Sequence, residues 1–321
     1  MLRFGICDRD QFRRIEAQGK LRTSAVSYSL LKVDDDAGDE DLRMFEAISL
    51  RLRTSNGTVR MTFANRFRDV DEVASRILQV NFDPKAALRI QDRAVSHGLT
   101  SYEWAQRLFV LFPDAQIEAS DRILNFYRIA LPNGDVYILE PDGQPIQYIR
   151  PPFVISMAYR EPFRFPLNHL IAMHAKKQFR KSGLGRNWKQ SADSAHLSVD
   201  QICCIHPRAR QLSKADQRFR ICARSVFDPT PGLDVLRTMN ILNRDYFSAD
   251  QLTEGATAAF RSLNPGGIWI LGRTLEEDSS NHVTFLKRTH DGWEILQRIG
   301  RGSEIEELAL RAPASSSRRN S

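Results

Sequence analysis

The stretch that most constrains the fold is residues 87–102, ALRIQDRAVSHGLTSY. Leu88 and Ile90 alternate as in a β-strand, Asp92 follows, and small residues then form a turn before Thr100, which suits the first turn of a helix. The pattern predicts a strand, a tight loop and a helix start. In α/β sheets ligands bind where strands end, and a helix start presents unpaired N–H groups there. We therefore expect any small-molecule site of this chain at this loop.

The residues after this loop continue the alternation of strands and helices. Residues 100–112 are amphipathic, as in a helix, and residues 116–120 are typical of a second strand that ends on Asp121. A strand, a helix of this length and a second strand imply a right-handed parallel crossover. The ends of the two strands are therefore expected side by side.

The second half of the chain resumes the alternation and ends in a hairpin. The predicted elements are strands at residues 199–205, 218–226, 234–241 and 268–273, helices at 207–215 and 249–263, and hairpin strands at 282–287 and 293–298. One ambiguity concerns residues 201–228, which form a strand–helix–strand pattern of their own and could add an extra strand to the sheet. The fold class is predicted to be α/β, with a mostly parallel sheet closed by an antiparallel hairpin.

The flanking and inserted segments differ from this alternation. Residues 1–80 are predicted to form an α+β N-terminal extension without a catalytic constellation, and residues 81–310 the main domain. Turn signals within residues 124–163 predict a β-hairpin insertion that forms a lid, a substrate wall or a decorated sheet edge. Residues 311–321 are poor in apolar residues and rich in serine and arginine, so we expect a disordered tail.

The composition is that of an ordinary soluble protein. Hydrophobic residues make up 42% of the 321 residues, which is enough for a core. The first residues carry charges where a signal peptide needs an apolar run, and no apolar stretch reaches the roughly eighteen residues of a membrane span. We therefore expect a cytoplasmic protein without membrane contacts.

The four cysteines show no spacing typical of a metal or redox motif. Cys203, Cys204 and His206 are the combination that a zinc ion would need, but neighbouring residues of a strand point to opposite faces. We expect reduced cysteines and no metal site, with zinc at these residues as the alternative.

The net charge of +7 permits an acidic partner. Part of the excess lies in one basic segment, which contains Lys176, Lys177, Arg180, Lys181, Arg186 and Lys189. This segment lacks the regular aromatic residues of a platform that stacks single-stranded nucleic acid. A solvated helix face is the favoured interpretation, and nucleic acid binding stays an alternative.

Five segments occur in an order that resembles a known family. They are IQDRAVSHGLTS, IEASD, FRICARSVFD, DVLRTMNILNRDYF and SLNPGGIWILGRT. Their order from residue 86 to about residue 300 resembles the class I S-adenosylmethionine-dependent methyltransferases, which have a Rossmann-like, seven-stranded sheet ending in a hairpin. The stretch around Asn240 is similar to the chemotaxis-receptor methyltransferases, which carry an Asn–aliphatic–Leu sequence and an aromatic pair there.

The resemblance implies S-adenosylmethionine as the cofactor and assigns it a set of contacts. Asp92, Ser96 and Gly98 would line its methionine and ribose side, and Asp121 would hold the ribose hydroxyls. Phe227 and Asp228 would meet the adenine, and Asn240 would lie beside the methyl group. The chain departs from the family at Ala94 and Val95, where glycine is usual.

The function implied is methyl transfer to an unidentified acceptor, either a small molecule or a protein. Displacement at a sulfonium carbon depends mainly on alignment and exclusion of water, so no obligatory catalytic residue is expected. Tyr246 and His206 are candidates for a base, and the reaction also proceeds without one. The alternative is a catalytically silent relative that acts as an interaction module, since Ala94 and Val95 narrow the path of the cofactor.

Overall fold

The computed structural model describes residues 5–21, 24–58, 60, 62–157, 165–185, 187–275 and 277–316. The chain forms two compact units. Unit 1 combines Met1–Thr62 with Ile123–Pro207, and unit 2 combines Phe63–Arg122 with Arg208–Ser321. This division differs from the predicted one, in which residues 1–80 form an extension and residues 124–163 an insertion into the main domain.

Unit 2 is built on a seven-stranded sheet, counted over the described residues, with the order β10-β4-β3-β11-β12-β13-β14. The strands are β3 (Arg89–Arg93), β4 (Gln116–Asp121), β10 (Phe219–Ala223), β11 (Leu233–Met239), β12 (Leu263–Thr274), β13 (Asn281–Arg288) and β14 (Trp293–Ile299). The five strands from β10 to β12 are parallel, and β13 is antiparallel to both its neighbours. The predicted α/β class, with a mostly parallel sheet and a terminal hairpin, is confirmed.

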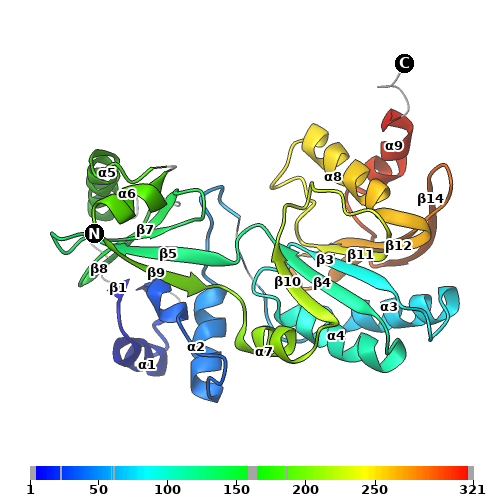
Figure 1. Cartoon of the computed structure of the whole chain (residues 1–321), viewed down its shortest axis with the longest axis horizontal. Coiled ribbons are helices and arrows are strands. Elements are labelled where there is room, and N and C mark those ends of the chain that lie inside the picture. Colours follow the sequence, from blue (N-terminus) through cyan, green and yellow to red (C-terminus); the bar gives the residue numbers. More distant parts are fainter. Residues whose placement is uncertain are drawn as a thin grey trace. The chain divides into compact units, whose positions relative to one another are not determined.

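Helices cover both faces of this sheet. They are α3 (Arg68–Asn81), α4 (Leu99–Leu111), α7 (Pro207–Ala215), α8 (Ala249–Ser262) and α9 (Glu306–Ser316). Figure 1 shows α3 and α4 on one side of the sheet and α8 and α9 on the other. The crossover from β10 to β11, residues 224–232, is fully described and contains no helix.

Unit 1 has a separate antiparallel sheet, with the order β8-β7-β6-β5-β9 among the strands that the structure describes. Its strands are β5 (Asn125–Ala130), β6 (Val136–Leu139), β7 (Pro145–Arg150), β8 (Phe153–Ser156) and β9 (Ser198–Cys203). The remaining elements are β1 (Gly5–Ile6), β2 (Ala25–Val26), α1 (Arg9–Ala17), the 3-10 helix η2 (Tyr28–Leu31), α2 (Asp39–Ser49), α5 (Pro166–Lys181) and α6 (Trp188–Ser194).

The N-terminal residues and the predicted insertion fold together because they share a core. Phe12, Phe45 and Ile48 from the N-terminal segment pack in one cluster with Phe126 and Ile138 from the sheet. Within the predicted insertion β5 and β6 pair as an antiparallel hairpin, and β7, β8 and β9 extend this pair into the five-stranded sheet. Residues 158–163 of the predicted insertion lie outside the described residues.

Two further expectations are settled by the chain's path. The strand near residues 199–205 is β9, which pairs with β5 in unit 1, so it adds no strand to the sheet of unit 2. The predicted tail at residues 311–321 is partly wrong, because α9 continues to Ser316. Ala309 and Ala312 are buried in one cluster with residues of α8. Residues 317–321 lie outside the described part of the chain.

The segment of basic residues lies on α5 and α6 of unit 1. Lys177, Arg180, Lys181 and Lys189 are exposed, and Arg186 falls outside the described residues. No helix within the described ranges combines the length and the apolar character that crossing a membrane requires.

Helix α8 begins with a capping box that fixes its start after β11. The Ser248 hydroxyl accepts from the N–H of Gln251, and the Gln251 side chain accepts from the N–H of Ser248 at 3.1 Å. Behind this cap, Leu252, Ala256 and Ala259 are buried against the sheet.

Replacing the capping serine is expected to destabilise unit 2 in a residue-specific way. Ser248→Ala removes the side-chain acceptor and should lower the free energy of unfolding by about 1 kcal/mol, whereas Ser248→Gly should cost only about a few tenths. Urea denaturation followed by circular dichroism measures both. A negligible loss for Ser248→Ala, no larger than that for Ser248→Gly, would show that the cap contributes nothing.

Candidate functional site

The predicted site residues gather at one edge of the sheet of unit 2. Because β3, β4, β10, β11 and β12 are parallel, their carboxyl ends share that edge. Asp92 lies in β3, Ser96 and Gly98 follow it, and Asp121 ends β4. Two further predicted groups, Phe227 with Asp228 and Asn240, follow β10 and β11 at the same edge.

The loop between β3 and α4 has an unusual backbone. Ala94, Ser96 and Gly98 have φ angles of 59°, 60° and 78°, in the left-handed region. The two non-glycine residues there cost about 1–2 kcal/mol each. Val95 is not in this region, so the positions that favour glycine are Ala94 and Ser96 rather than Ala94 and Val95.

Hydrogen bonds fasten this loop to the neighbouring strand. The backbone N–H of Ser96 donates to Oδ2 of Asp121 at 2.8 Å, and that of Val95 donates to the carbonyl of Ser120 at 3.2 Å. Gly98 is the N-cap residue of α4, and the first N–H groups of a helix have no partner within the helix. The edge thus combines the carboxylate of Asp121 with the backbone N–H groups of the loop and of the start of α4.

Below the loop lies a buried cluster of three charges. Nε of Arg237 donates to Oδ1 of Asp92 at 3.0 Å and Nη2 to Oδ2 at 2.5 Å, while Nη1 donates to Oδ1 of Asp71 at 2.7 Å. The hydroxyl of Ser101, in the first turn of α4, also donates to Asp92, at 2.6 Å. The guanidinium lies 4.1 Å from the centre of the Trp104 ring.

This cluster joins four elements beneath the candidate site. Asp71 comes from α3, Asp92 from β3, Arg237 from β11 and Ser101 from α4. Asp92 is 3% exposed and its oxygens accept from Arg237 and Ser101, so it positions the strand end and the helix. Its predicted contact with a cofactor stays a prediction.

Burial raises the pKa of Asp71 to about 7, and the nearby charge of Asp92 acts in the same direction, whereas Arg237 opposes it. Two carboxylates share one guanidinium, so ionising both leaves excess negative charge in the interior. Sequence reasoning missed Asp71 and Arg237. The available signal was Arg237 itself, a charged residue within the apolar strand LDVLRTM.

The other predicted residues occupy the loops that follow β10 and β11. Phe227 is half-buried, and its ring meets Phe247 edge-on with centroids 5.1 Å apart. Asp228 is exposed, and its Oδ2 accepts from the N–H of Ser225. Asn240 has a φ of 61° and its Oδ1 accepts from the N–H of Thr274 at 2.6 Å. This last bond ties the ends of β11 and β12 together.

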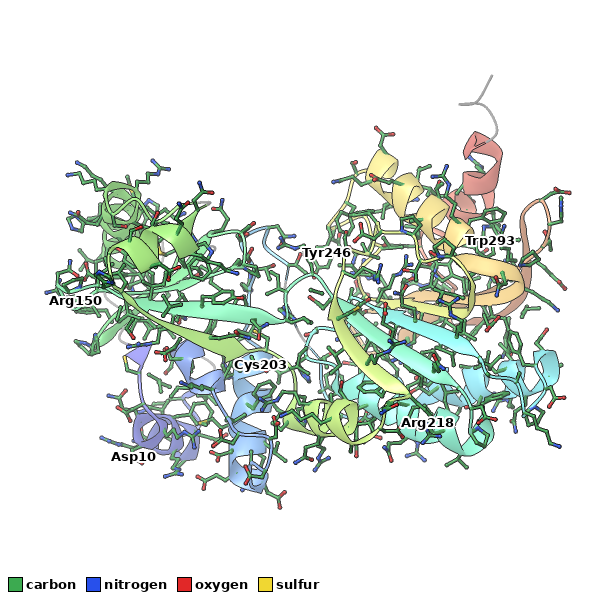
Figure 2. The ribbon with its side chains drawn as sticks, in the orientation of Figure 1. Asp10, Arg150, Cys203, Arg218, Tyr246 and Trp293 are labelled. Carbon is green, nitrogen blue, oxygen red and sulfur yellow. The ribbon has the colours of Figure 1, made fainter. Side chains whose placement is uncertain are left out.

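Of the two candidate bases, Tyr246 lies in the loop after β11 and is 37% exposed (Figure 2). His206 belongs to unit 1, where it is fully buried and its Nε2 lies 3.2 Å from Oε1 of Glu46. Burial with this partner makes His206 a structural residue. Cys203 ends β9 and Cys204 follows it (Figure 2), and within the residues described no group of three metal-ligating side chains occurs.

Solved structures that match this chain include methyltransferases, at low sequence identity and low TM-scores. No protein-family model matches it, and neither does any curated protein. The 1,6-didemethyltoxoflavin-N1-methyltransferase of Burkholderia thailandensis, solved with S-adenosylhomocysteine, is 13% identical with a TM-score of 0.33, and the match covers 76% of this chain and 70% of that one.

Two further solved structures match with similar values. An O-methyltransferase family protein from Burkholderia thailandensis is 11% identical with a TM-score of 0.29, covering 84% of this chain and 53% of its own. The S-adenosylmethionine-dependent methyltransferase SibL is 13% identical with a TM-score of 0.27, covering 66% and 38%. The chain thus spans about half or less of these two proteins. At such TM-scores the fold assignment rests on the strand order of unit 2.

The left-handed loop residues give a first testable expectation. Ala94→Gly removes the strain of an alanine in the left-handed region, but it also makes the unfolded chain more flexible. The free energy of unfolding should therefore stay unchanged or rise by up to about 1 kcal/mol. Ala119→Gly, in the buried and regular strand β4, should instead destabilise by about 1 kcal/mol. Urea denaturation compares the two. A loss for Ala94→Gly as large as for Ala119→Gly would contradict the assigned backbone.

The buried cluster gives a second expectation, on pH. A raised pKa means that the folded state binds the Asp71 proton more tightly than the unfolded state, so stability falls as pH rises between about 4 and 7. From pH 6 to pH 8 this contribution falls by about 1.4 kcal/mol.

Asp71→Asn should remove that part of the pH dependence. The measurement is urea denaturation of both proteins at pH 6, 7 and 8, with Asp114→Asn, at an exposed carboxylate before β4, as the matched control. The idea fails if the parent and Asp71→Asn change in parallel over this range.

Proposed function

We propose that unit 2 binds S-adenosylmethionine at the carboxyl edge of its sheet and transfers the methyl group to an acceptor. The observation that carries the proposal is the bond between the N–H of Ser96 and Asp121, which joins a left-handed loop to the acid at the end of the next strand. This places backbone donors and a carboxylate side by side, as a nucleoside with an amino-acid tail requires.

Each residue would recognise a different part of this ligand. The N–H groups at the start of α4 suit the methionine carboxylate, because a helix start favours negative charge. Asp121 suits the ribose hydroxyls, and the half-buried ring of Phe227 offers an apolar face for the adenine. Asp228 is an acceptor for the adenine amino group, and Asn240 lies where β11 ends, beside the expected position of the methyl group.

S-adenosylmethionine, when bound, would supply a methyl group on a sulfonium, and the carbon–sulfur bond would break as the acceptor's lone pair forms the new bond. The chain's part is to hold the two reactants in line and to exclude water. Tyr246, exposed at this edge, is the candidate base; it would accept the acceptor's proton as the phenolate, and the reaction also proceeds without a base. The acceptor itself is a small molecule or a protein, as the similarity around Asn240 to chemotaxis-receptor methyltransferases also permits.

Ala94 and Ser96 support one competing function. Both carry a Cβ at left-handed positions, where glycine is the residue without strain, and this reduces the space beside the loop. A catalytically silent interaction module would bind cofactor weakly or without turnover. Binding and transfer therefore have to be measured separately.

Binding is tested by calorimetric titration with S-adenosylhomocysteine and S-adenosylmethionine. Asp121→Ala should weaken binding about 10- to 100-fold, because hydrogen bonds to a charged group contribute about 1.5–3 kcal/mol. Asp121→Asn should weaken it less, because its carbonyl can still accept from Ser96. Asp114→Ala, just before the same strand, should change nothing.

Transfer is tested with methyl-labelled cofactor in cell extracts. Labelled product that disappears with Asp121→Ala supports the enzyme. Binding without any labelled product supports the silent module. Absence of heat and of a thermal shift at millimolar cofactor contradicts the enzyme.

A further inference from the structure

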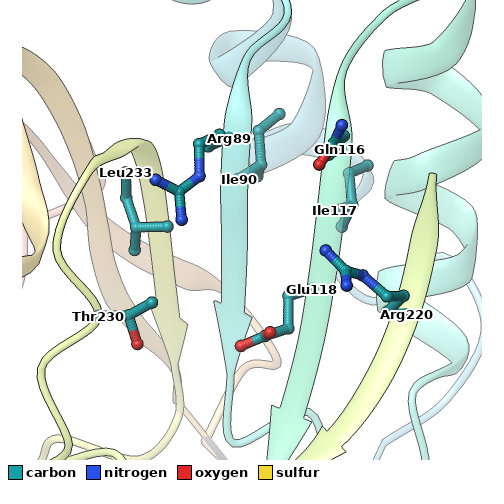
Figure 3. A pocket seen from close by; sticks show the side chains of 8 residues that line it. All are labelled: Arg89, Ile90, Gln116, Ile117, Glu118, Arg220, Thr230 and Leu233. Carbon is teal, nitrogen blue, oxygen red and sulfur yellow. The ribbon is translucent and has the colours of Figure 1, made fainter.

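Unit 2 carries a pocket away from the candidate site, on the sheet face that also packs against α8. It lies over β3, β4 and β10, and its polar lining consists of Arg89, Gln116, Glu118, Arg220 and Thr230. Figure 3 shows Arg89 and Arg220 on either side of the space, with Glu118 and Thr230 beside it.

The pocket exists because this part of the sheet lacks a covering helix. The crossover from β10 to β11 is an irregular segment, residues 224–232, instead of a helix. Buried parallel strands are normally apolar on both faces. Here every second residue is polar, as in Arg89, Gln91 and Arg93 of β3 or Gln116, Glu118 and Ser120 of β4. This face is therefore built to meet something polar.

The charges of the lining are not balanced. Within the described part of the chain, the exposed side chains of Arg89 and Arg220 make no hydrogen bond or ion pair. The acid of the pocket, Glu118, is engaged, because Gln91 Nε2 donates to its Oε1 at 2.5 Å and Arg224 Nε lies 3.3 Å from the same oxygen.

A further buried cation adds to the positive potential. Arg93 is 1% exposed, and burial together with the neighbouring charge of Arg224 lowers its pKa to about 10, so it is charged at neutral pH. Its Nε donates to Gln91 at 2.6 Å, which in turn binds Glu118. The acid of the pocket is thus held within a network of donors, and two guanidinium groups remain for a ligand.

We propose that this pocket binds the oxyanion group, phosphate or carboxylate, of a small ligand between Arg89 and Arg220. Guanidinium groups form charge-assisted hydrogen bonds to both kinds of group. The Thr230 hydroxyl and the Gln116 amide supply neutral donors. A cavity volume of about 50 Å³ accommodates one such group.

The site is separate from the proposed cofactor site. Arg89 is the first residue of β3, and the left-handed loop follows Arg93, the last one. Four residues of strand separate them by about 13 Å. Failure of cofactor binding would therefore not contradict an oxyanion site in this pocket. Failure of oxyanion binding would likewise not contradict the proposed cofactor site.

The test uses inorganic phosphate and acetate as probes, titrated calorimetrically into the full chain at constant ionic strength without cofactor. A millimolar Kd is expected for the matching probe, corresponding to about 4 kcal/mol of binding free energy. Arg89→Ala and Arg220→Ala should each weaken binding at least about tenfold. The matched control is Arg76→Ala on α3, since Arg76 is also exposed and also without such a partner among the described residues.

The outcomes decide as follows. Saturable binding of phosphate, acetate or both, lost in the two pocket variants and kept in Arg76→Ala, supports the site and identifies its class of ligand. Binding that is absent for both probes overturns it. Binding that persists in both pocket variants also overturns the proposal, because the two arginines then do not hold the probe. Binding that weakens equally in Arg76→Ala overturns it as well, because the loss then reflects overall charge. Circular dichroism confirms that each variant is folded.

Discussion

The buried contact between Arg237 and its two aspartates is the interaction on which unit 2 depends most. A guanidinium without solvent contact is costly unless each N–H finds an acceptor. Asp71 and Asp92 supply those acceptors from a helix and a strand that both lie far from Arg237 in the sequence. Asp92 of the same cluster also accepts a hydrogen bond from Ser101 in the first turn of α4. The ion pairs of Arg237 therefore help to fix the loop between β3 and α4.

Local sequence patterns predicted unit 2 well and unit 1 poorly. Strand and helix periodicity is a local property, and β3, α4, β4 and α8 lie within a few residues of their expected positions. The assignment of residues 1–62 to the inserted sheet depends on contacts such as the stacking of Tyr28 on Phe126, which joins segments about a hundred residues apart. Periodicity carries no information on which apolar faces meet.

The candidate site shows the same limit at the level of single residues. Asp121 was predictable because an acid at a strand end lies beside the next loop, and the structure brings it to the N–H of Ser96. The left-handed φ of Ser96 was not predictable from residue type, because serine seldom adopts it. Arg237 was visible as a charged residue in an apolar strand, but its partner Asp71 comes from a helix in another part of the chain.

The interleaved path of the chain has a consequence for its synthesis. Unit 1 needs residues from both sides of Phe63–Arg122, and β9 enters its sheet only near residue 200. The apolar residues of α1 and α2 therefore leave the ribosome long before the strands that cover them. At about 5–20 residues per second this interval lasts on the order of ten seconds. During that time the apolar residues of α1 and α2 lack the strands that complete their core.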